Sequence, residues 1–253
     1  MTRPPVSSWD VVTTLRHFAI VTYAVDPERI RPQVHSRFEI DCFRDHDGAF
    51  KAWVSMVPFK VHDFRFVGAP WFKFYFGQTN YRTYVIDRET GRRAVWFFGT
   101  TLDSWSVFIP RYAWKLPWHH GHIEFDCSFD STRGRYTAYK MTARSDWAPV
   151  ELELEDSGQL VTQLPGSNDP EAGLAILTYP LLGVCYRSDG ALGMYRIWHD
   201  RLTLSTGRCV RARVGLFHRL GIVPFAEQAQ PHSVLIQPEA EFTIYLPPRR
   251  FAA

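Results

Sequence analysis

Residues 93–125, RAVWFFGTTLDSWSVFIPRYAWKLPWHHGHIEF, combine an apolar run with tryptophans, a lysine and three histidines. Ligand pockets join an apolar lining to a few placed polar groups, so this stretch is predicted to form the wall and floor of a pocket. Trp96, Trp105 and Trp118 are the candidate aromatic ligand contacts within it. The alternative for each is ordinary core packing, because aromatic side chains dominate cores everywhere.

The histidine cluster admits a metal interpretation. In a strand, His120, His122 and Glu124 share one face and offer two imidazoles and a carboxylate, the donor types that zinc prefers. The same face continues with Asp126 and Ser128, however, which is typical of a solvated surface. We therefore predict no metal site.

His119 lies on the other face of this strand, together with Ile123 and Phe125. That apolar face is the one expected to be buried. We predict His119 as a catalytic pocket residue, either a neutral hydrogen-bonding group or a general acid/base, because its titration lies near neutral pH.

Arg82 stands in the middle of the strand-like run NYRTYVID and shares a face with Tyr84, whereas Tyr81 and Thr83 point the other way. If the Arg82 face lines a cavity, its planar guanidinium can bind a carboxylate through two parallel hydrogen bonds. Arg82 and Tyr84 are therefore predicted ligand-binding residues. The alternative for Arg82 is an ion pair with an acid such as Asp103.

A second candidate pair, Arg196 and His199, lies in the run MYRIWHD. Alternation places the two side chains on opposite faces of a strand, so one of them is expected at the surface.

Composition narrows the class of protein. The 253 residues are 45% hydrophobic and 15% aromatic, enough for a sizeable core, and the formal net charge is only +3. The arginines are spread out, so neither nucleic acid nor an anionic membrane is an expected partner. The four cysteines form no C-x-x-C pair, and no apolar stretch approaches eighteen residues. With an N-terminus that lacks a signal-peptide core, this predicts a cytoplasmic protein.

Short apolar and aromatic runs separated by turn residues predict an all-β or α+β fold with about ten strands and a single domain over residues 1–253. A helix is expected after Asp26, which precedes Pro27 as an N-cap, and residues 60–79 are expected to be an irregular covering loop because Gly68, Pro70 and Gly77 interrupt them. The predicted strands are 17–25, 38–44, 50–59, 81–87, 93–99, 123–129, 135–144, 150–155, 192–199, 209–214 and 233–246, with a further short helix at 170–177.

Several motifs in order resemble a known family. They are AWVSMVPF (52–59), NYRTYVID (80–87), AVWFFGTTLDSW (94–105), LPWHHGHIEF (116–125), LLGVCYRSDGALGMYRIWHD (181–200) and EFTIYLPP (241–248). Together they resemble the acetoacetate decarboxylase-like superfamily, specifically its uncharacterised YqjF-like branch, over nearly the whole chain. The resemblance implies a closed, cone-like antiparallel β-barrel with a few short peripheral helices around a small-molecule pocket.

The resemblance also implies where decarboxylase chemistry would be found. In acetoacetate decarboxylases a lysine pair follows an aromatic–proline dipeptide, and the first lysine forms a Schiff base with the keto acid. Here Leu116 and Pro117 are followed by Trp118 and His119. Lys115 is the nearest substitute nucleophile, and its alternative is a lysine whose head lies in water.

The function expected from these residues is binding of a small organic (keto) acid or carbonyl compound in an enclosed pocket. Arg82 would hold the anion and His119 the reacting end, with lyase-like acid/base chemistry that uses no Schiff base and no cofactor. The alternatives are a non-catalytic carrier or sensor, and a barrel filled by its own side chains. Self-association as a homo-oligomer is left open.

Overall fold

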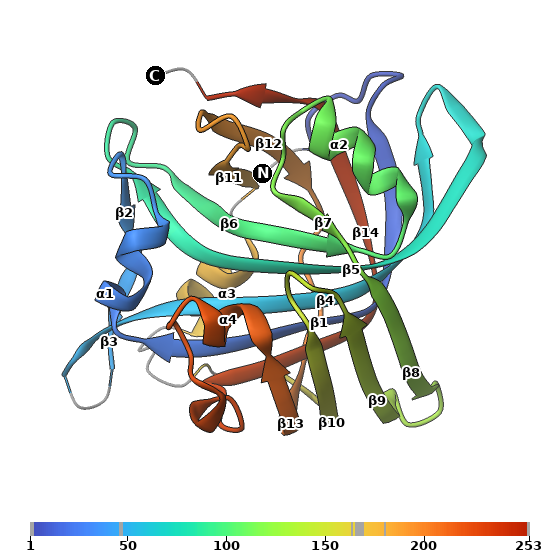
Figure 1. Cartoon of the computed structure of the whole chain (residues 1–253). Coiled ribbons are helices and arrows are strands. Elements are labelled where there is room, and N and C mark those ends of the chain that lie inside the picture. Colours follow the sequence, from blue (N-terminus) through green and yellow to red (C-terminus); the bar gives the residue numbers. More distant parts are fainter. Residues whose placement is uncertain (1–2, 46–47, 163, 165–169, 180, 252–253) are drawn as a thin grey trace.

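A computed structural model describes residues 3–45, 48–162, 164, 170–179 and 181–251, and arranges them around a 14-stranded sheet (Figure 1). Seven of its strands close into a barrel in the order β1–β4–β5–β6–β11–β12–β14, because β1 pairs with β14 as well as with β4. These strands are β1 (Val11–Val25), β4 (Phe50–Phe66), β5 (Ala69–Asp87), β6 (Arg93–Leu102), β11 (Leu182–Tyr186), β12 (Leu192–Trp198) and β14 (Ser233–Arg250). The expected closed barrel is confirmed, with one qualification: β6 and β11 run parallel, so the barrel is mixed.

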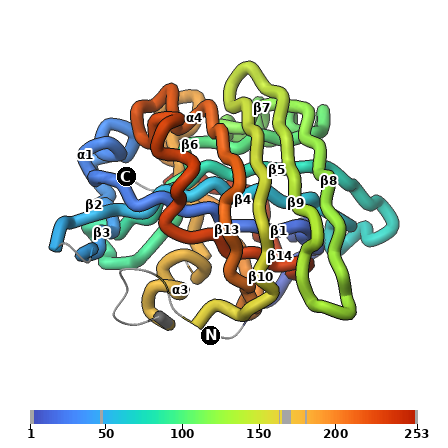
Figure 2. The backbone as a smooth tube through the Cα atoms, turned by 90° about the horizontal axis from the view of Figure 1, so that it is seen from below, coloured from blue at the N-terminus to red at the C-terminus, as the bar shows by residue number. Residues whose placement is uncertain are grey.

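A second layer covers part of the barrel's outer face. It consists of β13 (Ser205–Val214), β10 (Val150–Leu160), β9 (Arg135–Arg144) and β8 (His122–Asp130), which lie side by side and cross in front of β4 and β5 (Figure 2). This layer branches from the barrel where Ser205 and Thr206 pair with β14. Short strands β2 (Phe38–Ile40), β3 (Cys42–Arg44) and β7 (Trp118–His120) add to β5, β4 and β6 respectively.

The apolar side chains form two cores, one on each face of the barrel wall. One core lies between the barrel and the outer layer and includes Tyr81, Trp96 and Tyr139. The other lies inside the barrel and includes Phe59 and Phe97. Both faces of strands such as β6 are buried, so their sequences are continuous apolar runs in which apolar and polar residues do not alternate.

The expected covering loop at residues 60–79 is wrong. These residues extend β4 and β5 into one long hairpin whose pairing runs from Val54–Thr83 to Phe66–Ala69. Pro58, which has no N–H to donate, is tolerated because the β1 ladder is interrupted there by a bulge between Arg16 and Val21. Gly68 and Pro70 lie at the hairpin tip, whereas Gly77 lies in regular pairing with Lys60, where a Cβ would meet the side chain of Ile123.

Other elements agree more closely with expectation. Asp26 caps α1 (Pro27–Ile30) by accepting a hydrogen bond from Glu28 N at 2.9 Å, and the predicted strand 38–44 divides into β2 and β3 at Asp41. The remaining helices are α2 (Phe108–Tyr112), α3 (Pro170–Thr178) and α4 (Gly215–Arg219), with 3-10 turns η1 (Arg31–Gln33), η2 (Trp105–Val107) and η3 (Phe225–Glu227). Strands β7 and β11 and helix α2 were not predicted. No helix within the described ranges is long and apolar enough to cross a membrane.

Candidate functional site

The barrel interior holds a cavity of about 260 Å³. Its lining is mostly aliphatic and aromatic and comes from β1, β4, β5, β6, β12 and β14, with residues of α3 at one end and of α2 at the other. The polar lining residues are Thr13, Gln78, Asn80, Arg82, Ser106, Thr178 and His199. A few polar groups in an apolar chamber are the composition expected of a small-molecule site.

Strand β5 supplies three of these polar side chains, Gln78, Asn80 and Arg82, through its period of two. Phe74, Phe76, Gln78, Asn80 and Arg82 all point into the cavity. The intervening Tyr81 is fully buried on the opposite face, in the core beneath the outer layer. The alternation that predicted an inward Arg82 therefore holds over this whole segment.

Arg82 has few partners for a cation in such an environment. Its Nη2 donates to the main-chain carbonyl of Leu177 in α3 at 3.0 Å, and its guanidinium carbon lies 5.6 Å from the ring centroid of Tyr84. Its Nε is buried without a hydrogen-bond partner. The acid considered as its partner, Asp103, lies instead 3.5 Å from His122, and no carboxylate in the described ranges pairs with Arg82.

Burial shifts the pKa of two groups near Arg82, Tyr195 and His199, and the positive charge of Arg82 acts to lower the pKa of both. Burial raises the pKa of Tyr195 well above its usual range, against the opposing effect of Arg82. Burial also lowers the pKa of His199, and Arg82 lowers it further, although two main-chain carbonyls oppose the shift. Those carbonyls belong to Asp200, at 2.7 Å from Nδ1, and Thr178, at 2.9 Å from Nε2.

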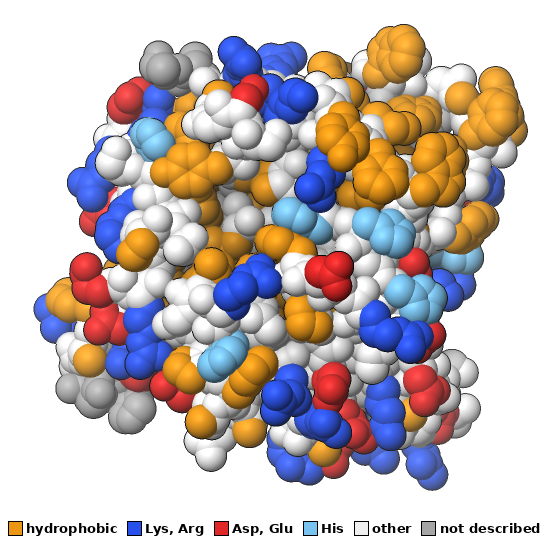
Figure 3. Space-filling model, viewed as in Figure 1, with side chains coloured by type: hydrophobic (Ala, Val, Ile, Leu, Met, Phe, Trp, Pro, Cys, Tyr) orange, Lys and Arg blue, Asp and Glu red, His pale blue; other side chains and the backbone are white. Residues whose placement is uncertain are grey.

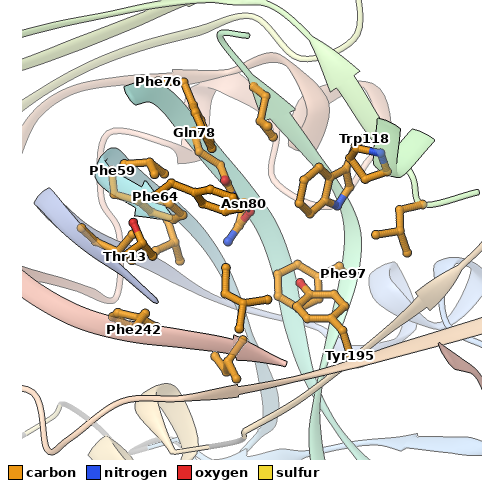
Figure 4. A pocket seen from close by; sticks show the side chains of 18 of the residues that line it. Thr13, Phe59, Phe64, Phe76, Gln78, Asn80, Phe97, Trp118, Tyr195 and Phe242 are labelled. Atoms are coloured by element: carbon orange, nitrogen blue, oxygen red, sulfur yellow. Dashed lines mark hydrogen bonds between the residues drawn. The ribbon is translucent and has the colours of Figure 1, made fainter. Parts of the chain in front are cut away.

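Asn80 presents a hydrogen-bond donor to the cavity. Its Oδ1 accepts from Gln78 Nε2 and from Thr100 Oγ1, both at 2.9 Å, which fixes the amide with its nitrogen on the other side. Figure 4 shows this nitrogen pointing into the cavity, away from Gln78. Sequence reasoning missed Asn80, although its place two residues before Arg82 on the same face was a usable signal.

The cavity reaches the surface beside α2 and the β4–β5 hairpin. Among its lining residues, Trp105 is 71% exposed, Ile109 52% and Phe74 41%. Hydrophobic side chains gather on this part of the surface, over the hairpin and α2 (Figure 3). Exposed members beyond the lining are Trp71, Phe72, Tyr75, Phe108 and Tyr112.

The predicted aromatic ligand contacts separate into two groups. Trp105 and Trp118 line the cavity, Trp105 at its mouth. Tyr84 is buried against the Arg82 guanidinium, and its hydroxyl is 3.4 Å from Leu177 O. Trp96 lies on the outer face of β6, with its ring packed on Phe38 and Tyr186 at centroid distances of 5.6 and 5.0 Å. Trp96 therefore does not reach the cavity.

His119 is also placed outside the cavity. Its ring stacks on Trp147 at a centroid distance of 3.9 Å and an interplanar angle of 4°, and its Nδ1 lies 3.3 Å from Arg111 Nη1. Burial, followed by the positive charges of Arg111 and Arg219, lowers the pKa of His119 to about 4. Since a guanidinium can only donate, Nδ1 is the acceptor and His119 is neutral.

Lys115 does not line the cavity either. It adopts a left-handed backbone conformation with φ of 58°, and its carbonyl accepts a hydrogen bond from Ser188 N. All five lysines of the chain fall within the described residues, and none is among the cavity-lining residues: Lys51, Lys60, Lys73, Lys115 and Lys140. The structure therefore places no lysine amine in the lining of this cavity.

Of the other residues singled out from the sequence, His122, Glu124 and Arg196 lie at the surface, and His199 is buried. His122 Nε2 is 2.9 Å from Glu124. The strand expected through this region is interrupted at Gly121, which separates β7 from β8 and packs against Thr101. Arg196 is exposed and lies over the Tyr245 ring, whereas its neighbour His199 lines the cavity. The expectation that one member of this pair faces solvent is thus confirmed.

Comparison with known proteins agrees with this architecture. The profile of a family of uncharacterized conserved proteins, DUF2071 (COG2071), matches residues 12–241. Among proteins with curated descriptions, none matches significantly.

Solved structures with a similar fold include an acetoacetate decarboxylase from Legionella pneumophila, at 12% identity and a TM-score of 0.61, covering 100% of this chain and 92% of the other. The enduracididine biosynthesis enzyme MppR with HEPES bound is similar at 14% identity and a TM-score of 0.60, covering 100% and 89%. An acetoacetate decarboxylase-like enzyme from Sphingomonas wittichii RW1 is similar at 11% identity and a TM-score of 0.58, covering 98% and 95%. The chain shares the fold of these acetoacetate decarboxylase-like structures, and it belongs to the DUF2071 family of uncharacterized conserved proteins.

Proposed function

We propose that this protein binds a small organic acid inside the barrel, with its carboxylate on Arg82. The observation that carries the proposal is the state of Arg82, a guanidinium in an apolar cavity with one main-chain acceptor and a buried, unpartnered Nε. A buried cation without a counter-ion is costly, and a carboxylate ligand supplies both the charge and the missing acceptors.

The acids that fit best carry a second oxygen. The amide nitrogen of Asn80 points into the same cavity and can donate to a carbonyl or hydroxyl oxygen of the ligand. A structure of similar fold, MppR, has been solved with pyruvate and with a condensation product of pyruvate. That likeness supports 2-oxo acids as the first compounds to test.

A transformation of the bound acid is the second candidate function. It would proceed by acid/base chemistry without a Schiff base, because no lysine lines the cavity. His119 lies outside, so the candidate groups beside Arg82 are Tyr195 and His199, and His199 would first have to release a main-chain carbonyl from one of its ring nitrogens. If His199 or Tyr195 moves a proton, 2-oxo acids will exchange the hydrogens next to their carbonyl with solvent deuterium, which proton NMR detects. Binding without exchange supports the carrier or sensor role.

The binding experiment compares wild type with Arg82→Met by calorimetry and thermal shift, using pyruvate, 2-oxobutanoate and acetoacetate. A ligand that binds only the folded protein raises its melting temperature. Loss of a charge-assisted hydrogen-bonding group is worth about 1.5–3 kcal/mol, so Arg82→Met should weaken binding roughly 10- to 150-fold.

Arg196→Met is the matched control, because Arg196 is exposed on β12 and does not line the cavity. It should bind as the wild type does. If no organic acid binds the wild type, or if Arg82→Met binds as tightly as the wild type, the proposal is wrong.

A further inference from the structure

The cavity is elongated along β5. Its lining residues on this strand run from Phe74 to Arg82, eight residues apart, which is about 26 Å of strand at roughly 3.3 Å per residue. The neighbouring strands repeat the pattern, with Thr13 to Ile20 of β1 and Val57 to Phe66 of β4 also in the lining. The cavity is therefore an elongated channel that follows these strands.

The two ends of the channel differ in chemistry. Arg82 lies at the α3 end, next to Leu177 and His199. The opposite end is mostly apolar, with Ser106 beside Trp105, and reaches the surface at Trp105, Ile109 and Phe74. Figure 4 shows Phe59, Phe64 and Phe76 grouped on the side of Gln78 away from Tyr195. A three- or four-carbon keto acid held at Arg82 would leave this apolar half unfilled.

We propose that the ligands preferred by this site are unbranched monocarboxylic acids of medium chain length, with the carboxylate on Arg82 and the alkyl tail along the channel toward α2. This inference rests on the proposed function and narrows its ligand class. The tail fills the apolar half, where its burial contributes through the hydrophobic effect, and its end emerges among exposed aromatic side chains. The Arg82 end supplies the only cationic side chain among the lining residues of the described cavity.

The test measures the affinity of saturated acids from propanoate to dodecanoate by calorimetry, at concentrations below those at which the long acids self-associate. Each added CH₂ that becomes buried should raise affinity about fourfold, since burial contributes about 0.8 kcal/mol per CH₂ and 1.4 kcal/mol is tenfold. The gain should level off once the tail reaches the mouth. Primary alcohols of the same length should bind more weakly than the acids.

Two variants probe the two ends of the channel separately. Arg82→Met should weaken all the acids by a similar factor, in the range of 10- to 150-fold, and leave the alcohols nearly unchanged. Val61→Phe, which adds bulk to a lining position on β4 away from Arg82, should lower the affinity of the long acids and leave propanoate binding intact. Retained propanoate binding also shows that this variant folds.

The outcomes distinguish this inference from the function on which it rests. If all the acids bind within about twofold of one another and depend on Arg82, the chain-length inference is wrong and the proposed function stands. If affinity grows with tail length equally in wild type and Arg82→Met with no loss overall, the acids adsorb to the exposed aromatic surface and the inference is also wrong. If no acid binds, the proposed function itself fails.

Discussion

The guanidinium of Arg82 donates to the main-chain oxygen of Leu177 at 3.0 Å, and through this bond the inner wall of the barrel is tied to the helix that covers one end of it. The same guanidinium leaves Nε buried and without a partner. Arg82 thus makes one structural hydrogen bond and keeps a second donor, Nε, free for a ligand. Such an unsatisfied buried group is expected where function lowers stability.

Replacing Arg82 by methionine should therefore not destabilise the empty protein. The variant loses one hydrogen bond but also removes a desolvated, incompletely paired cation, and the two effects are each of the order of 1–3 kcal/mol. We expect the free energy of unfolding of Arg82→Met, measured by urea denaturation at pH 7 without ligand, to lie within about 1 kcal/mol of wild type or above it. A loss of more than about 3 kcal/mol would show that Arg82 is mainly a structural residue.

Keto acids should form no reducible adduct with this protein. A Schiff base needs an amine in the cavity, and all five lysines lie outside its lining. Incubation with acetoacetate or pyruvate followed by borohydride should leave the mass of the intact protein unchanged. A stable mass increase that maps to Lys115 would contradict the placement of that residue outside the site.

The alternation of β5 was enough to place Arg82 inside and Tyr81 outside, because a strand exposes its faces with a period of two. The same reasoning could not place Trp96 against its neighbour Phe97, since β6 is buried on both faces, by the barrel interior and by packing outside it. Position along one strand also could not show that β7 pairs in parallel with β6 and turns His119 toward Trp147. These placements depend on long-range pairing that local sequence does not encode.

His119 should make the protein sensitive to mild acid. Burial lowers the pKa of His119 to about 4 in the folded chain, whereas an unfolded histidine titrates near 6.5. Between these values the unfolded state binds more protons than the folded state. The contribution of the neutral His119 to the free energy of unfolding is therefore fully present above about pH 6.5 and is lost as pH falls toward 4. His17 and His199 add to this trend, because burial lowers the pKa of each.

The measurement is the free energy of unfolding of wild type and His119→Phe at several values between pH 4 and 7. Phenylalanine keeps the stacking on Trp147 and cannot be protonated, so the variant should show a shallower decline than wild type. Equal slopes for the two proteins would mean that His119 is not held neutral in the fold.

Binding of an acid at Arg82 should be accompanied by proton uptake at His199. In the empty protein, burial and then the charge of Arg82 lower the pKa of His199, while the carbonyls of Thr178 and Asp200 favour its protonated form. A carboxylate on Arg82 cancels part of the opposing charge, so the pKa of His199 is higher in the complex than in the free protein. Affinity should then increase as pH falls through the pKa of His199 in the complex, because a group with the higher pKa in the complex takes up protons on binding.

Calorimetry in two buffers of different ionisation enthalpy gives the number of protons taken up, and His199→Gln should bring that number to zero while retaining binding. Net proton release by the wild type, or uptake that survives in His199→Gln, would show that His199 is not the coupled group.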